Sequence, residues 1–196
     1  MVNDPIVTGK GVSLFLPVTP PIVKALYDLH RGGRRNMFNV HPPTTETVEQ
    51  WAQTFRRGFH TDFAVVDNSS GRLLGYMWSY EYIAQHGNCL IGAMFRPDLI
   101  HDDDGLRLNI AHLEGLALFI DVLFDEWPLD IIGIECSDST LKQFESFLPR
   151  LFTMCEARKG WLRHGGSRES MTFGSMTREA WNDSRFSYNK FWRVGT

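Results

Sequence analysis

Residues 108–124 constrain the fold of this chain more than any other stretch, because they are largely apolar and long enough for a single helix of several turns. Such a helix must be covered by other elements over most of its surface. Residues 129–135 follow as a short apolar run, which is typical of a strand buried on both faces of a sheet. The chain therefore predicts a long helix packed against a sheet.

The rest of the chain divides into strands and helices at its turn and capping residues. Strands are expected where apolar residues alternate or cluster, at residues 12–16, 63–66, 73–82, 89–95 and 129–135, and as a pair between residues 152 and 173. Further helices are expected after the N-cap candidates Thr19, Thr44 or Thr45, and Asp138 or Ser139, with a short last helix at residues 177–181.

The resulting order is β-α-α-β-β-β-α-β-α-β-β. Strands that first cluster and then alternate with helices favour an α/β fold with a mixed sheet and helices on both faces. Residues 1–183 are expected to form one domain, and residues 184–196 a loose C-terminal tail. Arg185 in this tail could contact RNA or a second subunit, and docking on its own domain or on a partner chain is the preferred interpretation.

Composition excludes several classes of protein. The net charge is −3 and the sequence pI is about 6.1, so the chain has no overall basic character for nucleic acid. No apolar run reaches the roughly 18 residues of a membrane span, and residues 1–11 do not resemble a signal peptide. The three cysteines are odd in number and have no metal-type spacing, which favours buried thiols and a reducing cytoplasm. We expect no metal site, and the acidic run at residues 102–104 is interpreted as a solvated loop or helix cap.

Three motifs occur in order along the chain. The first is residues 71–76 (Gly-Arg-Leu-Leu-Gly-Tyr), and the second is residues 114–116 (Glu-Gly-Leu), with Phe124 further on. The third joins residues 158–163 to residues 173–181 (Phe-Gly-Ser-Met-Thr-Arg-Glu-Ala-Trp). Together they resemble the entry of the long central strand, the donor-side helix and the closing hairpin of the GNAT N-acyltransferase superfamily, in the branch of ribosomal-protein and small-molecule N-acetyltransferases. The resemblance implies a mixed, mostly antiparallel central sheet flanked by helices.

The resemblance also implies a cleft between the strands that end near Phe95 and Ile134, where an acyl donor such as acetyl-CoA is bound. The expected donor contacts are Met94, Phe95, Arg96, His101, Gly105, Arg107, Ser137 and Thr140. Glycines normally let the backbone approach the donor's pyrophosphate at a helix N-terminus. If the signature is aligned on Gly105, its first position is acidic and Arg107 replaces the second small residue. If it is aligned on Glu114 and Phe124, its two small positions become Leu108 and Ile110, so the loop is degenerate in either alignment. Phe144 stands where many relatives have a tyrosine that protonates the leaving thiolate.

The acceptor side is expected to hold an aromatic face and a base. Tyr76, Trp78, Tyr80 and Tyr82 alternate along one strand and should share a face. Glu81 or a bound water is the candidate base, Ser137 is a second catalytic candidate, and backbone N–H groups near Met94–Arg96 would polarise the acyl carbonyl. Tyr76, Trp78, Tyr80, Arg34 and Arg35 are the candidate substrate contacts.

Three functions are compatible with these residues. The first is an N-acyltransferase in which a small-molecule or peptide amine attacks the donor directly. The second keeps the fold but takes its acyl group from an aminoacyl-tRNA or an acyl carrier protein. The third is a binding protein that has lost catalysis. A homodimer is compatible with all three.

Overall fold

The structure is a computed structural model that describes residues 4–17, 19–32, 47–96, 105–138, 141, 148–164 and 167–192; for residues 105–109, 161–164, 167 and 186–192 only the backbone is described. Arg34, Arg35, His101, Thr140 and Phe144 therefore lie outside the described residues.

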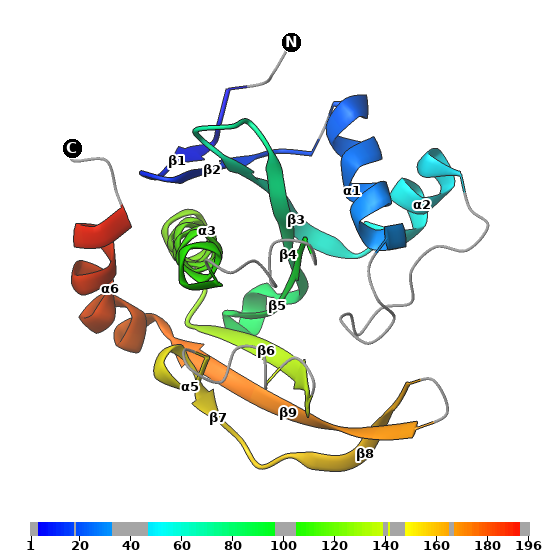
Figure 1. Cartoon of the computed structure of the whole chain (residues 1–196). Coiled ribbons are helices and arrows are strands. Elements are labelled where there is room, and N and C mark those ends of the chain that lie inside the picture. Colours follow the sequence, from blue (N-terminus) through cyan, green and yellow to red (C-terminus); the bar gives the residue numbers. More distant parts are fainter. Residues whose placement is uncertain are drawn as a thin grey trace.

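One sheet organises the described chain (Figure 1). Its strands are β1 (Val7–Thr8), β2 (Val12–Phe15), β3 (Phe59–Asp67), β4 (Leu73–Ile83), β5 (Asn88–Phe95), β6 (Ile131–Ser137), β7 (Thr153–Met154), β8 (Arg158–His164) and β9 (Ser167–Thr177). They lie in the order β1-β2-β3-β4-β5-β6-β9-β7, and β8 also pairs with β9. The β5–β6 pair is parallel and the other pairs are antiparallel. The predicted α/β fold with a mostly antiparallel sheet is confirmed.

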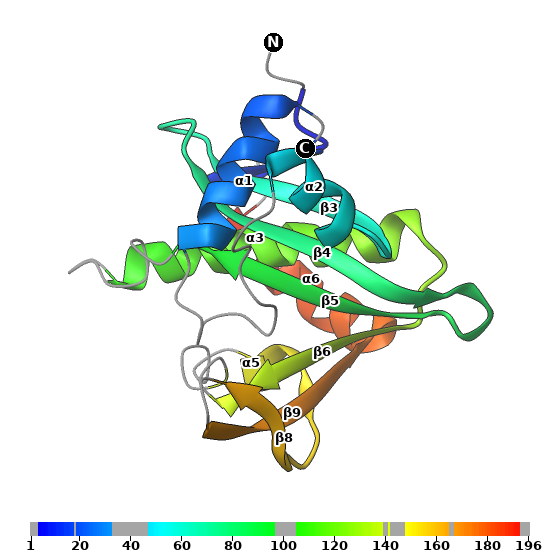
Figure 2. The same cartoon turned by 90° about the vertical axis from the view of Figure 1, so that its right-hand side faces the viewer.

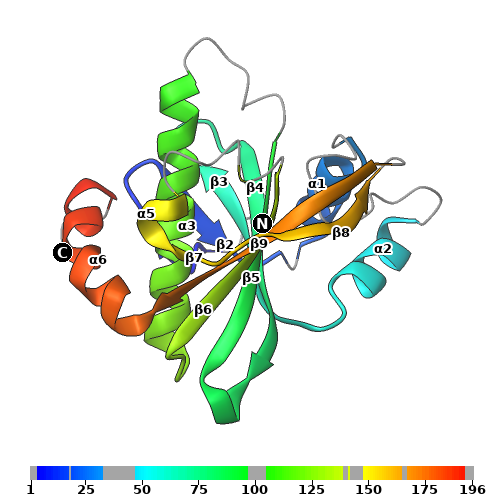
Figure 3. The same cartoon turned by 90° about the horizontal axis from the view of Figure 1, so that it is seen from below.

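Helices cover both faces of this sheet (Figure 3). The helices are α1 (Pro20–Gly32), α2 (Val48–Phe55), α3 (Gly105–Glu126), α5 (Leu148–Leu151) and α6 (Arg178–Trp192), and a 3₁₀ turn, η1 (Ala84–His86), joins β4 to β5. α3 and α6 contribute to the larger apolar cluster on one face, whereas α1 and α2 pack on β4 and β5 on the other. We call these the α3 face and the α1–α2 face.

The second helix begins later than the sequence analysis proposed. Its N-cap is Thr47, which accepts a hydrogen bond from the Gln50 N–H, while the Gln50 side chain accepts one from the Thr47 N–H. This is a capping box, which satisfies two backbone donors at once. The proposed caps, Thr44 and Thr45, are therefore wrong.

The aromatic stripe on β4 is interrupted by a bulge. Tyr76, Trp78 and Tyr80 belong to the α1–α2 face, but Tyr82 packs against the cluster on the α3 face. The register between β4 and β5 shifts between Tyr80 and Ile83, and Glu81 has a φ of +50° in the left-handed region. An extra residue in one strand reverses the side on which later side chains lie. The prediction that Tyr82 shares the face of the other three is therefore wrong.

Helix α3 is held to the sheet by close backbone approach and by one buried carboxylate. A Cβ on Gly115 would come within 2.9 Å of Val65 Cγ1, so a side chain there would push the helix away from β3. Glu114 is buried, and it accepts hydrogen bonds from the Gly11 N–H at 2.9 and 3.2 Å. Burial raises the pKa of Glu114, and the backbone N–H groups of residues 10–12 oppose that rise. This gives a physical reason for the Glu-Gly-Leu motif.

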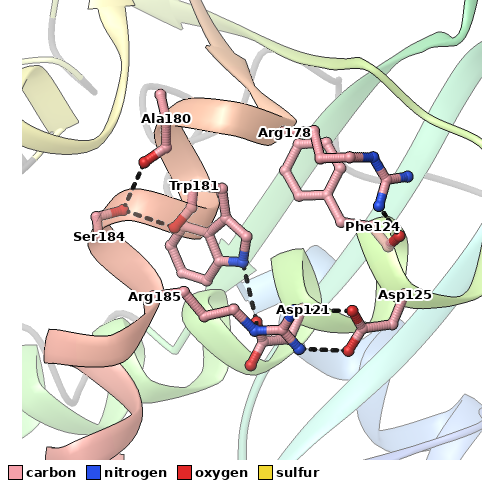
Figure 4. Close-up of polar contacts among 8 residues, drawn as sticks. All are labelled: Asp121, Phe124, Asp125, Arg178, Ala180, Trp181, Ser184 and Arg185. Atoms are coloured by element: carbon pink, nitrogen blue, oxygen red, sulfur yellow. Dashed lines mark hydrogen bonds and ion pairs between the residues drawn. The ribbon is translucent and has the colours of Figure 1, made fainter.

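The C-terminal helix is tied to α3 through buried polar contacts (Figure 4). Trp181 is fully buried and its Nε1–H donates to Asp121 Oδ1 at 2.9 Å. Arg185 Nε lies 2.8 Å from the same oxygen, and the Arg185 guanidinium also pairs with Asp125. The boundary predicted at residue 183 falls within α6, which continues to Trp192.

Arg178 adds a second tie at the end of α3. Its guanidinium donates to the backbone oxygens of Phe124, Trp127 and Leu129. These carbonyls lie where helix α3 ends, so an arginine satisfies acceptors that the helix itself leaves open.

The cysteines partly follow the prediction. Cys89 and Cys136 are buried in the core, whereas Cys155 is exposed, and all three are free thiols. The expectation that every cysteine is buried is therefore wrong for Cys155.

Trp181→Phe tests the tie between α3 and α6. The phenyl ring keeps most of the buried apolar area but removes the N–H that binds Asp121, so we expect a loss of about 1–3 kcal/mol in the free energy of unfolding. Urea unfolding measures it. Ser184→Ala is the matched control, because the Ser184 hydroxyl binds only carbonyls of its own helix. A loss no larger than that of the control contradicts the assignment.

Candidate functional site

The sheet opens between its two central parallel strands. β5 and β6 pair only from Asn88↔Ile131 to Ile91↔Ile134. Beyond that point, among the residues that the structure describes, β5 continues to Phe95 paired with β4 only, and β6 continues to Ser137 paired with β9 only. Figure 2 shows the two strands together at one end and apart at the other. We call the opening between Gly92–Phe95 and Glu135–Ser137 the β5–β6 wedge.

Each strand of the wedge is held by its outer neighbour. The β4 register runs without a break from Gly75↔Phe95 to Tyr80↔Leu90, and β9 pairs with β6 as far as Ser137↔Met171. The strands can therefore separate without either one losing all of its ladder hydrogen bonds. The opening therefore lies between strands of the sheet itself.

The edge of β5 directs backbone groups into the wedge. The Arg96 N–H donates to Leu74 O at 2.9 Å, on the β4 side. Neighbouring residues in an antiparallel ladder point their peptide groups to alternate sides. Met94 therefore also faces β4, whereas the peptide groups of Ala93 and Phe95 face the wedge. Of the predicted carbonyl-polarising donors between Met94 and Arg96, only Phe95 faces the correct way, and Ala93 joins it.

A tryptophan covers the closed end of the wedge. Gly92 is the first residue of β5 past the last β6 pair, and Trp78 is its partner on β4. A Cβ on Gly92 would come within 2.4 Å of the Trp78 indole. Any residue other than glycine would therefore displace this ring, which lies over the strand edge on the α1–α2 face.

A tyrosine and a glutamate meet at the same place. On β6, Ile132, Ile134 and Cys136 pack into the cluster on the α3 face. Glu135 alternates with them, so it lies on the α1–α2 face. The Tyr80 hydroxyl donates to Glu135 Oε2 at 3.2 Å, from a strand two positions away in the sheet. Burial and the Glu135 charge raise the pKa of Tyr80, so its hydroxyl stays protonated at any ordinary pH.

Sequence reasoning named Glu81 as the candidate base and did not name Glu135. Glu81 is exposed at the β4 bulge, on the side of Tyr80 away from the wedge opening. Glu135 is half-buried and begins the open part of β6. The signal available in the sequence was a carboxylate at the end of an otherwise apolar strand, followed two residues later by Ser137, which is buried in the structure.

Tyr76 has a structural position and offers no surface to a substrate. It is fully buried, and its hydroxyl donates to Asp62 Oδ2. Arg56 binds the same carboxylate, with Nε 2.6 Å from Oδ2 and Nη2 3.0 Å from Oδ1. Burial and the Asp62 charge raise the pKa of Tyr76. Of the predicted aromatic contacts, Trp78 and Tyr80 border the wedge and Tyr76 does not.

Two of the predicted donor contacts lie in the first turn of α3. Gly105 begins this helix and Arg107 lies in its first turn. An N-terminal turn presents backbone N–H groups to anions, which keeps both residues as predicted donor contacts.

His112 lies deeper on the same helix, and the sequence analysis did not assign it a role. It is buried, its ring lies 4.2 Å from the Phe95 ring, and neither ring nitrogen has a hydrogen-bond partner. Burial lowers the pKa of His112 to about 4. A neutral His112 therefore supports the part of β5 that borders the wedge.

Within the described ranges, no helix is both apolar and long enough to cross a bilayer. Likewise, no three His, Cys, Asp or Glu side chains of the described part of the chain come together as a metal site.

His112→Leu tests this support through the pH dependence of stability. Because the folded-state pKa of His112 lies below its unfolded value near 6.5, the unfolded chain binds more protons between about pH 6.5 and 4, and stability falls as pH falls through that window. Between about pH 7 and pH 4, we expect the free energy of unfolding of His112→Leu to fall by about 2–3 kcal/mol less than that of the wild type. Urea unfolding at each pH measures the difference. The pKa of His60 is also lowered, but His60 is present in both proteins. Equal losses in the two proteins contradict the assignment.

No family model and no curated protein matches the sequence. Solved structures do match the fold. A GCN5-related N-acetyltransferase from Brucella melitensis has a TM-score of 0.72 and 17% identity, over 97% of this chain and 87% of that chain. A spermidine N-acetyltransferase from Vibrio cholerae, in complex with CoA and spermine, has a TM-score of 0.69 and 13% identity, over 88% of this chain and 98% of that chain.

A GNAT-family acetyltransferase from Bacillus anthracis has a TM-score of 0.64 and 14% identity, over 88% of this chain and 98% of that chain. At these identities the likeness establishes the fold alone. The chain has the fold of the GNAT acetyltransferases, as the three sequence motifs indicated.

Proposed function

We propose that this chain is an N-acyltransferase that moves an acyl group, in the first instance acetyl from acetyl-CoA, to an amine by direct attack. The observation that carries the proposal is the β5–β6 wedge. A parallel pair that separates inside a sheet leaves two facing strand edges that do not pair with each other, and the donor is proposed to lie between them in extended conformation.

The wedge supplies groups suited to a thioester. The peptide groups of Ala93 and Phe95 line its β5 edge, and their N–H groups are positioned to polarise an acyl carbonyl. Gly105 and Arg107, in the first turn of α3, would bind the donor phosphates, with the helix dipole favouring negative charge. Ser137 stays a proposed donor contact, on the opposite strand of the wedge.

Glu135 is the proposed base. It lies at the closed end of the wedge, on the face where α1 and α2 cover the sheet and where Trp78 and Tyr80 form an aromatic wall. A carboxylate there attracts a protonated amine and can take its proton before or during attack. Aromatic faces also favour cations. The acceptor is therefore proposed to be a small-molecule or peptide amine.

The solved relatives support the same donor and acceptor chemistry. One of them is a spermidine N-acetyltransferase bound to CoA and spermine. A polyamine is accordingly the first acceptor to assay. The alternative donors, an aminoacyl-tRNA or an acyl carrier protein, and the homodimer stay predictions.

Donor identity can be tested by thermal unfolding. A ligand at 100 times its dissociation constant stabilises the folded state by about 2.7 kcal/mol, which is several degrees in the midpoint of unfolding for a domain of this size. We expect acetyl-CoA to raise the midpoint. If aminoacyl-tRNA or acyl carrier protein raises the midpoint and acetyl-CoA does not, the donor belongs to the second class. If none of them raises the midpoint, the chain is better explained as a binding protein without catalysis.

The identity of the base can be tested by two matched substitutions. We expect Glu135→Gln to lower kcat for acetyl transfer to spermidine by about 10²-fold or more, because the amide cannot accept the proton of the amine. Glu81→Gln makes the same chemical change at the competing candidate, which is exposed at the bulge, and we expect kcat within about twofold of the wild type. Release of free thiol measures both rates. If kcat falls more in Glu81→Gln than in Glu135→Gln, Glu81 is the base and Glu135 is not.

A further inference from the structure

We propose that Tyr80 and Glu135 act as one proton relay, in which Glu135 receives the proton of the acceptor amine and Tyr80 delivers a proton to the departing thiolate. This inference rests on the proposed acyl transfer and adds the general acid that the reaction needs.

The position of the pair carries the argument. Glu135 is the first residue of β6 beyond the last β5–β6 pair, and the Tyr80 hydroxyl lies 3.2 Å from its Oε2. A donor that lies along the Ala93 and Phe95 peptide groups has its reactive end at the closed end of the wedge. Trp78 walls that end, and the pair lies beside it. Both side chains are therefore placed against the bond that breaks.

Tyr80 brings a phenol to the wedge from across the sheet. It belongs to β4, and its hydroxyl passes beside β5 to reach Glu135 on β6. A proton donor and a carboxylate from different strands therefore meet on the α1–α2 face at the closed end of the wedge.

Electrostatic coupling favours one order of events. Burial, together with the charge of ionised Glu135, raises the pKa of Tyr80, so the phenol holds its proton. When Glu135 accepts the proton of the amine, the effect of its charge disappears and the phenol becomes a better acid than before. Donation by Tyr80 is therefore easier after the amine has lost its proton than before.

The relay balances in protons and bonds. The acceptor first releases the extra proton of its ammonium form to solvent, and the neutral amine nitrogen then forms a bond to the acyl carbon while Glu135 takes one N–H proton. The carbon–sulfur bond then breaks, the Tyr80 O–H proton goes to sulfur, and the Glu135 O–H proton returns to the Tyr80 oxygen. The products are an amide and a free thiol, and Tyr80 and Glu135 regain their starting states without an oxidant or a further reactant.

Tyr80→Phe separates the relay from a structural role. With acetyl-CoA and spermidine, we expect Tyr80→Phe to lower kcat by about 10²-fold while KM for acetyl-CoA changes by less than about threefold. Tyr82→Phe is the matched control, since it removes the same hydroxyl two residues along the strand, on the α3 face. The midpoint of thermal unfolding of each variant shows whether its fold is retained.

A donor with an acidic thiol gives the decisive comparison. 4-Nitrothiophenyl acetate expels a thiolate that needs no proton, so Tyr80→Phe should transfer acetyl from it to spermidine at close to the wild-type rate. Glu135→Gln should stay slow with both donors, because its defect precedes expulsion of the thiolate. The double variant should be no slower than Glu135→Gln alone with acetyl-CoA, because the two residues act as a unit.

The outcomes are distinguishable. Tyr80→Phe with an undiminished kcat overturns the relay and leaves the proposed function intact. Equal slowing of Tyr80→Phe with both donors assigns Tyr80 to positioning Glu135 and also overturns the relay. Absence of transfer by the unmodified protein, with acetyl-CoA and with 4-nitrothiophenyl acetate, overturns the proposed function and the relay together.

Discussion

Divergence of β5 and β6 after the Ile91↔Ile134 pair is the constraint on which the rest of the structure depends. Strand edges in a sheet are normally paired or covered, because unpaired backbone groups are costly when buried. Here β4 and β9 hold the two strands from outside, and the edges that face each other are where the donor is proposed to bind. The function proposed for this chain follows from that edge, and the side chains around it decide the chemistry.

Helix α3 must remain fixed if the wedge is to keep its shape, since it supports β5 from one face. Three polar contacts hold α3 at different positions along its length. Glu114 accepts the Gly11 N–H, Asp121 accepts the Trp181 indole N–H, and Arg178 binds the carbonyls at the end of the helix. The last two come from α6, so the C-terminal helix belongs to the scaffold of the site.

Local patterns predicted the elements that are determined locally. The long apolar helix and the buried strand after it were predictable from periodicity, and the Thr47–Gln50 capping box was also readable in the sequence, although the wrong threonines were chosen. The elements that the sequence analysis missed depend on contacts between residues far apart in the chain. α6 continues past residue 183, where Arg185 pairs with Asp121 sixty-four positions earlier. β3 begins at Phe59, before the predicted residues 63–66, and Arg56 balances the charge of Asp62 in this additional part of the strand. The wedge itself was predictable only through the family resemblance.

The identity of the base could not be predicted, because it depends on two strands that are not neighbours. Glu135 follows Ile134 and precedes Cys136, so the sequence alone describes a core strand with one charged residue. The Tyr80 hydroxyl that donates to Glu135 Oε2 belongs to β4, 55 positions earlier in the chain, and it reaches the carboxylate across β5. The pattern of apolar and polar residues along one strand records which face a side chain occupies, but it does not record which strand lies two places away in the sheet. The surroundings that make Glu135 the proposed base are therefore set by the order of the strands, which only the folded sheet provides.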